Sequence, residues 1–254
     1  MIIRRDIYLN KLISKMDNGM IKIITGIRRS GKSFLLFNLF YQWLLEQGVD
    51  TAQIIRLSLD DIAYAEYRDP DKLYEYVINM ASDKDKKYFI FLDEIQYAIS
   101  KSELKDRHGV VRLYDVLNGF LHKRNFDVYV TGSNSKLLSS DVLTEFRGRG
   151  DEIHIVPLSF VEFFSARGGS EDEAWQEYTY YGGLPHILSE PDEASKVQYL
   201  SRLNSEIYLR DIQERYDIQR QQGMEELMKV ISSSIGALTN PQRISDTFKS
   251  TGHS

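Results

Sequence analysis

The stretch that most constrains this chain is residues 26–33, which read Gly-Ile-Arg-Arg-Ser-Gly-Lys-Ser. It matches the pattern G-x-x-x-x-G-K-[ST] at every position, and it lies between an apolar, β-branched run and an amphipathic run. The glycines allow a tight turn whose backbone N–H groups point at phosphate oxygens, and the following helix adds the positive end of its dipole. The sequence therefore predicts a phosphate-binding loop between a strand and a helix, rather than an ordinary Gly-rich turn.

Each residue of this loop is a candidate for binding a nucleotide. We expect Lys32 to reach the β- and γ-phosphates and the Ser33 hydroxyl to bind Mg²⁺. The candidates are Gly26, Ile27, Arg28, Arg29, Ser30, Gly31, Lys32 and Ser33. Charge agrees with an anion site near the N-terminus, because residues 1–36 hold eight Lys or Arg and two Asp in a chain of net charge −5. On charge alone, ordinary surface variation explains the same pattern.

A second signal is the run Tyr-Phe-Ile-Phe-Leu-Asp-Glu at residues 88–94, an apolar strand followed by two acids. In a parallel sheet this strand would end beside the phosphate-binding loop, with Asp93 supporting Mg²⁺. Glu94 would point elsewhere and accept a proton from the water that attacks the γ-phosphate, and Gln96 would help to position that water. An acid pair favours water over another acceptor, so the sequence predicts hydrolysis of ATP.

Two later stretches carry candidate polar groups. Residues 130–135 end a strand in Val-Thr-Gly-Ser-Asn-Ser, where Ser133 or Asn134 would hydrogen-bond the γ-phosphate or the water, unless they only form a turn. Residues 146–150 read Phe-Arg-Gly-Arg-Gly. A glycine-flanked arginine there can stabilise transition-state charge, in the same chain or a neighbouring subunit, and Arg149 is preferred to Arg147. The alternative is a solvated basic loop.

Strand and helix signals alternate along the first 160 residues, which predicts a parallel sheet with helices on both faces. The predicted strands cover residues 20–25, 54–59, 88–92, 128–131 and 153–156. The predicted helices cover residues 33–47, 71–80 and 113–123. Mostly helical sequence follows, and Asn240-Pro241 predicts one more helix start. We expect an ATPase core over 1–165, a helical lid over 166–235 and the beginning of a further module over 236–254.

Composition excludes several other classes. Across 254 residues there is no cysteine, so disulfides and cysteine chemistry are excluded and a reducing, cytoplasmic location is expected. No apolar run approaches the length of a membrane span, and no membrane partner is expected. The five histidines lack metal-ligand spacing, and the arginines between residues 202 and 220 alternate with acids as on a solvated helix face.

Together these motifs resemble the AAA+ class of P-loop ATPases, and within it a poorly characterised bacterial and archaeal group. The group's features are present as Ile3 to Tyr8 (IRRDIY), residues 26–33, a T-G-S-N turn, Pro157 to Phe163 (PLSFVEF) and Tyr181 to Pro185 (YGGLP). The resemblance implies an ASCE-type α/β sandwich with a five-stranded parallel sheet, sensor roles for Ser133 and Asn134, and an arginine finger at Arg149. It also implies a winged-helix-like segment, only begun here, and a C-terminal domain of unknown function that is missing.

The sequence thus predicts Mg²⁺-dependent ATP binding and hydrolysis coupled to conformational change, with ATP, ADP and Mg²⁺ as ligands. Three alternatives stay open. They are a slow nucleotide-gated switch, a DNA-associated regulator acting through the winged helix of a longer chain, and a small-molecule kinase. The acid pair argues against the kinase. A homo-oligomer is the partner that an arginine finger acting between subunits would need.

Overall fold

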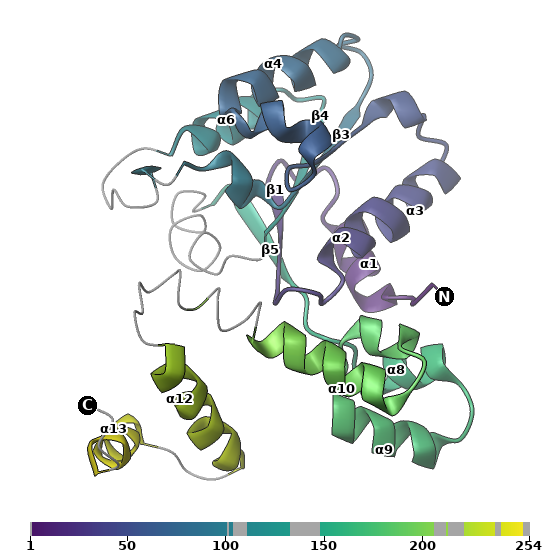
Figure 1. The fold of residues 1–254 in the computed structure, drawn as a ribbon. Helices are drawn as coiled ribbons and strands as arrows, with labels where there is room; N and C mark the ends of the chain where they lie inside the picture. The colour runs from purple at the N-terminus through teal and green to yellow at the C-terminus, as the bar shows by residue number, and fades with distance from the viewer. Residues whose placement is uncertain are drawn as a thin grey trace. The chain divides into compact units, whose positions relative to one another are not determined.

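The computed structural model describes residues 2–100, 102–103, 111–132, 148–205, 212, 221–236 and 240–250 (Figure 1). The chain forms two compact units, Met1–Ser189 and Glu190–Ser254. The first contains the sheet and the helices around it. The second contains α10 (Glu193–Arg202), α12 (Gln221–Ser233) and α13 (Pro241–Ser250). The predicted helix start at Asn240-Pro241 is confirmed by α13, where the Asn240 side chain accepts a hydrogen bond from the Gln242 N–H.

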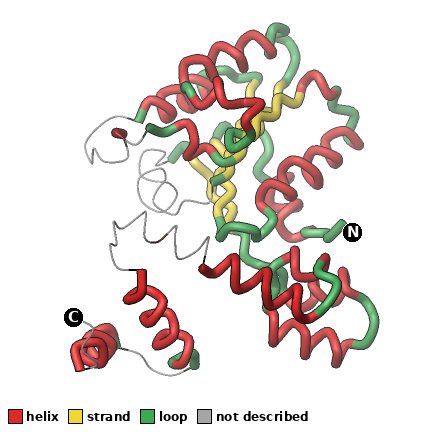
Figure 2. Tube along the Cα trace, in the orientation of Figure 1, coloured by secondary structure: helices red, strands yellow, loops and turns green. Residues whose placement is uncertain are grey.

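All five strands of the sheet are parallel, and their order is β2-β3-β4-β1-β5. They lie together between the helices of the first unit (Figure 2). The strands are β1 (Ile21–Thr25), β2 (Ile54–Ser58), β3 (Tyr88–Asp93), β4 (Phe126–Thr131) and β5 (Gly150–His154). This confirms the predicted α/β class and strand number. The carboxyl ends of parallel strands all lie on the same side of the sheet, so the residues that follow β1, β3 and β4 lie close together.

The fifth strand begins three residues earlier than the predicted range of 153–156 and ends before Ile155. The reason is its place at the edge of the sheet. Only Ile153 among its five residues is buried, so the strand carries polar side chains that an apolar pattern does not reveal. Ile155 lies beyond the strand but still donates its N–H to the Thr25 carbonyl.

Helices cover both faces of the sheet, as expected for parallel strands (Figure 1). On one face, α4 (Pro70–Met80) and α6 (Arg112–Leu121) pack on a core that includes Ile23, Ile90 and Val128. On the other, α1 (Asp6–Ser14) and the helix that follows the loop pack on Ile24, Phe91 and Tyr129. Because helices cover both faces of the central strands, the side chains of these strands are mostly apolar on both sides.

The helix after the loop runs as α2 (Lys32–Phe34), a π-helical segment (Leu35–Phe40) and α3 (Tyr41–Glu46). It confirms the predicted helix within one residue at each end, while the π-helical middle was not predicted. Helix α1 was also not predicted. Short 3-10 helices cover Thr51–Gln53, Ile62–Arg68, Ile95–Ala98 and Pro185–Ser189. Among the described helices, none is both long enough and apolar enough to cross a bilayer.

Two further helices belong to the first unit, α8 (Phe160–Arg167) and α9 (Glu171–Tyr181). They pack together through aromatic side chains, with the ring centroids of Phe160 and Trp175 4.8 Å apart. The stretch between β5 and α8 therefore leads directly from the sheet to this helix pair. The predicted domain boundary near residue 165, between the ATPase core and a helical lid, stays a prediction.

A buried ion pair joins two central strands. The Lys22 ammonium of β1 contacts the Asp127 carboxylate of β4, and both residues are almost fully buried. The other carboxylate oxygen accepts hydrogen bonds from the Tyr129 hydroxyl at 2.8 Å and the Asp17 N–H at 3.1 Å. With the two charges paired and both carboxylate oxygens hydrogen-bonded, the pair is tolerated in the core, but either partner alone would be an uncompensated buried charge.

Asp127→Asn is therefore expected to lower the free energy of unfolding by about 3–5 kcal/mol, because it leaves the Lys22 ammonium buried without its counter-ion. Urea unfolding followed by circular dichroism measures this. The matched control is Asp71→Asn, which removes the carboxylate of the exposed Arg112–Asp71 pair and is expected to cost less than about 1 kcal/mol. Equal losses in both variants would contradict the account of the buried pair.

Candidate functional site

The phosphate-binding loop leaves β1 at Thr25 and enters the helix at Lys32. Gly26 has a φ of +142°, and a Cβ atom there would lie 2.2 Å from the Ile155 carbonyl oxygen. Gly31 has a φ of +97°, and Arg29 also lies in the left-handed region at +67°. Both the backbone conformation and the close approach of the chain after β5 therefore require glycine at position 26.

The interior of the loop suits an anion. Lys32 is buried, and its ammonium donates to the carbonyl oxygens of Gly26 at 2.9 Å and Ile27 at 3.0 Å. Ser30 is fully buried, and its hydroxyl makes no hydrogen bond within the described residues. A cation bonded to neutral oxygens and an unsatisfied buried hydroxyl are both groups that a phosphate oxygen would satisfy.

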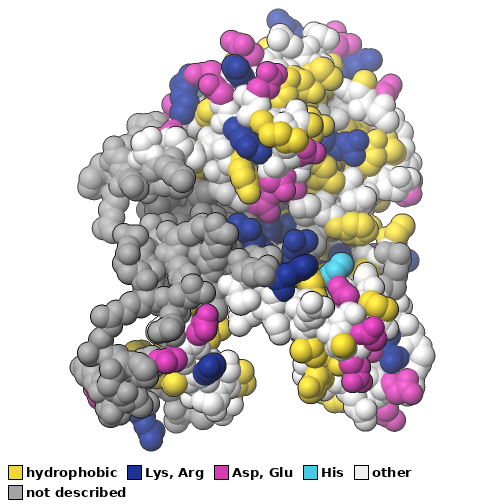
Figure 3. All heavy atoms as spheres, viewed as in Figure 1, with side chains coloured by type: hydrophobic (Ala, Val, Ile, Leu, Met, Phe, Trp, Pro, Cys, Tyr) yellow, Lys and Arg dark blue, Asp and Glu magenta, His cyan; other side chains and the backbone are white. Residues whose placement is uncertain are grey.

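Arginine side chains add to the positive potential of the loop. Arg28 is half-buried, and Arg29 is exposed. The visible face of the first unit carries a group of Lys and Arg side chains (Figure 3). Within the described ranges, no three His, Cys, Asp or Glu side chains form a cluster that could hold a metal ion by themselves.

Asp93 ends β3 and is 4% exposed. Burial raises the pKa of its carboxyl, while hydrogen bonds from the Thr131 and Ser33 hydroxyls act in the opposite direction. The Ser58 hydroxyl lies 3.4 Å from the second carboxylate oxygen. Ser33 is thus near enough to Asp93 to affect its pKa, and the oxygen atoms of both residues are of the type that Mg²⁺ prefers.

Lys32 lies close enough to the acid pair for charge to matter. Burial lowers the pKa of its ammonium, and the charges of Glu94 and Asp93 oppose that shift. The loop lysine and both acids of the strand end therefore share one site, although more than 60 residues separate them in sequence. This convergence follows from the parallel sheet.

Glu94 leaves the strand in a left-handed conformation, with φ 53° and ψ 51°. Its N–H donates to the Thr131 hydroxyl at 3.2 Å, and its carboxylate accepts a hydrogen bond from the Gln96 side-chain amide. Residues other than glycine adopt this conformation rarely, and the surrounding contacts must stabilise it. The turn directs Glu94 away from the line of the strand, so the two neighbouring acids face different surroundings.

Arg149 lies beside the starting ends of the strands, whereas the loop of its own chain lies at their other ends. Its carbonyl oxygen accepts a hydrogen bond from the Ile21 N–H at 2.8 Å, at the start of β1, whereas the loop follows the end of β1. Its side chain donates to the Asn118 amide oxygen at 3.2 Å. Ser133, Asn134 and Arg147 lie outside the described residues.

Comparison with known proteins identifies the family. A model described as an AAA domain matches residues 18–164, and a model of a domain of unknown function matches residues 172–253. The chain belongs to the AAA+ P-loop ATPase family. An uncharacterised protein of Haemophilus influenzae is 32% identical over 98% of the chain and 60% of its own length. Another, from Methanocaldococcus jannaschii, is 24% identical over 98% and 53%.

The solved structure of a Walker-type ATPase from Pyrococcus abyssi is similar, with a TM-score of 0.51 and 18% identity. The alignment covers 92% of this chain and 77% of that one, and the likeness shows the shared fold. The chain spans only about half to three-fifths of the length of the curated relatives it matches.

Sequence reasoning did not assign a role to Thr131, which contacts both acids of the AAA+ core. Its hydroxyl donates to the Asp93 carboxylate and accepts from the Glu94 N–H. The available signal was its position as the last residue of β4, beside the end of β3 in a parallel sheet. Recognising it requires the strand order, which no local pattern contains.

Asp93→Asn is expected to stabilise the nucleotide-free protein, because it removes a charge that burial disfavours. The gain is about 1 kcal/mol, which is about 2–4 °C in the midpoint of thermal unfolding. The raised folded pKa means that this gain is complete above that pKa and disappears as the pH falls toward the unfolded value.

Thermal unfolding at several pH values checks this expectation. The control is Asp85→Asn, which removes an exposed carboxylate and leaves the midpoint unchanged. A loss of stability in Asp93→Asn at neutral pH would contradict the account of the buried carboxyl.

Proposed function

We propose that this chain binds ATP with Mg²⁺, hydrolyses it and couples hydrolysis to a conformational change. The observation that carries the proposal is the convergence of the loop and the end of β3, where Ser33 and Lys32 interact electrostatically with the acids Asp93 and Glu94. A phosphate-binding loop joined to an acid pair in this way supplies the groups that phosphoanhydride hydrolysis needs. Family membership and the sheet order support the same activity.

The loop would bind the phosphates through its backbone N–H groups and Lys32. In the nucleotide-free chain, the Lys32 ammonium bonds to the carbonyls of Gly26 and Ile27. It would exchange these neutral partners for phosphate oxygens, which are stronger acceptors. Ser33 and Asp93 would hold Mg²⁺, which neutralises charge on the phosphates when bound.

Glu94 is the proposed general base. Its carboxylate is half-buried and accepts a hydrogen bond from the Gln96 amide. To take a proton from water it would exchange this contact for the water, and Gln96 would then help to orient the nucleophile. The left-handed turn at Glu94 supports separate roles for the two acids, because it directs the proposed base away from Asp93, the carboxylate that would bind the metal.

Arg149 is the proposed arginine finger, acting on a neighbouring copy of the chain. The full length of β1 separates it from its own loop, a distance of about 13 Å along a strand of this length. This separation favours action between subunits over action within one chain. Ser133 and Asn134 keep their proposed sensor roles. The alternative of a slow switch would need neither an oligomer nor the finger.

Glu94→Gln is expected to reduce the ATP turnover number by about a hundredfold to ten-thousandfold, because the amide cannot accept the proton. Nucleotide affinity should stay near that of the wild type. Steady-state phosphate release and titration with ADP measure the two quantities. Lys32→Ala is the matched control and should lose nucleotide binding itself. Unchanged turnover in Glu94→Gln would refute the assignment of the base.

Mixing two inactive variants tests the shared site. Arg149→Ala retains Glu94, and Glu94→Gln retains Arg149, so an equal mixture should restore activity at about a quarter of the sites if one subunit's finger serves the next. ATPase rates of the separate and mixed proteins, measured against protein concentration, give the answer. Failure of the mixture to exceed its components would favour the monomeric switch.

A further inference from the structure

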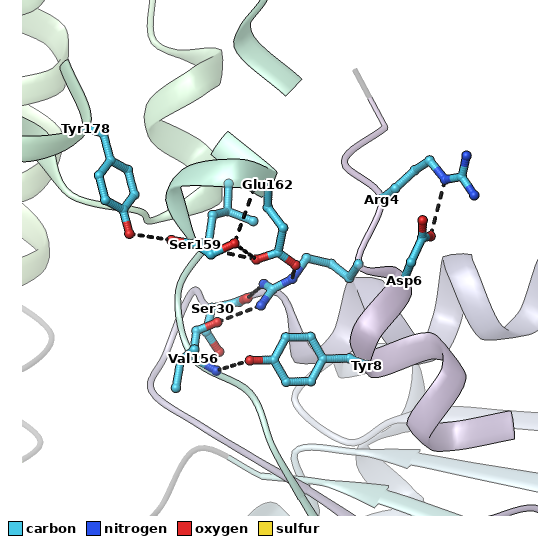
Figure 4. Close-up of polar contacts among 10 residues, drawn as sticks. Arg4, Asp6, Tyr8, Ser30, Val156, Ser159, Glu162 and Tyr178 are labelled. Carbon is cyan, nitrogen blue, oxygen red and sulfur yellow. Dashed lines mark hydrogen bonds and ion pairs between the residues drawn. The ribbon is translucent and has the colours of Figure 1, made fainter. Parts of the chain in front are cut away.

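An arginine near the N-terminus is buried beneath the phosphate-binding loop. Arg5 is 4% exposed, and its guanidinium donates to the Ser30 carbonyl at 3.1 Å and the Val156 carbonyl at 2.8 Å (Figure 4). The same group lies 4.6 Å from the centre of the Tyr8 ring. One side chain therefore joins the N-terminal segment, the loop and the chain after β5, which are far apart in sequence.

The charge of Arg5 is balanced by Glu162 of α8, whose Oε1 lies 2.9 Å from the Arg5 Nε. The other oxygen of this carboxylate accepts hydrogen bonds from the N–H and hydroxyl of Ser159, which caps the helix. A carboxylate engaged on both oxygens keeps a fixed position (Figure 4). Glu162 therefore neutralises the buried guanidinium from a fixed position, while the Ser30 and Val156 carbonyls orient it.

The segment around Glu162 is itself anchored. The Leu158 N–H donates to the Gly183 carbonyl at 2.7 Å, and the Tyr178 hydroxyl donates to the Leu158 carbonyl at 2.9 Å. A Cβ atom at Gly183 would lie 2.2 Å from that carbonyl oxygen. The two motifs at residues 157–163 and 181–185 thus pack against each other, and this packing restrains the segment that carries Glu162.

The contact with Ser30 bears on the loop's function through peptide geometry. In a trans peptide the C=O and the next N–H point in opposite directions, so holding the Ser30 carbonyl sets the direction of the Gly31 N–H. Gly31, with a φ of +97°, is a residue at which the peptide rotates easily. A bond from Arg5 restrains this rotation.

We propose that Arg5 is a positioning residue for nucleotide binding, which holds the Ser30–Gly31 peptide in the orientation that presents its N–H to phosphate. The inference rests on the proposed function, since it assumes that the loop binds nucleotide. Arg5 itself is bonded to protein oxygens and acts through the loop. Its effect is on ground-state and transition-state binding equally, because the loop contacts phosphate throughout the reaction.

The test compares Arg5→Ala and Arg5→Lys with Arg4→Ala. Arg4 is adjacent in sequence, but its side chain is 81% exposed and pairs only with Asp6 among the contacts of the described residues. Dissociation constants for MgADP are measured by calorimetry at a temperature where circular dichroism shows all variants folded. Thermal unfolding without nucleotide and steady-state ATP hydrolysis are measured on the same proteins.

Arg5→Ala is expected to raise the dissociation constant about tenfold, and the KM for ATP in step, with kcat within about twofold of wild type. Arg5→Lys keeps the charge but lacks the planar fork, so its dissociation constant should also rise. It provides the test if the alanine variant does not fold. Arg4→Ala should match the wild type in every measurement.

The outcomes separate the two proposals. Wild-type binding of MgADP, together with Arg5 variants that unfold at lower temperature but keep the wild-type dissociation constant and KM, would overturn this inference alone. A merely structural arginine gives that result. Absence of MgADP binding in the wild type would overturn the proposed function and, with it, the role of Arg5.

Discussion

Between β3 and β4, parallel pairing aligns Leu92 with Val130, so the residues that follow, Asp93 and Thr131, lie side by side. The pairing of β2 with β3 aligns Ser58 with Asp93 in the same way. A shift of one residue in either register would turn these side chains to the other face of the sheet. Such a shift would exchange the side chains that pack against the helices on the two faces, so the close packing of the core maintains the register. The polar site at the end of the strands depends on that register.

The first unit uses buried charge in two different ways. Lys22 and Asp127 neutralise each other, and both oxygens of the Asp127 carboxylate accept hydrogen bonds, which gives a structural pair in the core. Asp93 is held by hydroxyl groups, and burial raises the pKa of its carboxyl. Under the proposed function, a divalent cation would supply the charge that these neutral partners lack. The structural pair therefore lies near the start of β1 and β4, and the proposed binding site lies at the other end of the same sheet.

Most of the central architecture could be predicted because its signals are local. Five strands, the helix after the loop and the fold class follow from apolar periodicity and one glycine-rich motif. The edge strand β5 was misplaced by three residues because only Ile153 of its five residues is buried. Helix α1 was missed although Tyr8 and Leu12 supply its buried face and Leu9 and Ile13 pack beside them, because a nine-residue helix gives only a short periodic signal.

The sequence by itself determined the phosphate-binding loop and the acid pair, because each is a short motif whose chemistry depends on adjacent residues. Only the tertiary structure decided which residues surround them. Arg5 contacts Ser30 and Glu162, which are 25 and 157 positions away in the sequence. Arg149 lies at the opposite end of the strands from its own loop. The physical reason is that these relations depend on strand order and on the path of the chain over the sheet, which are properties of the packed core and of no single segment.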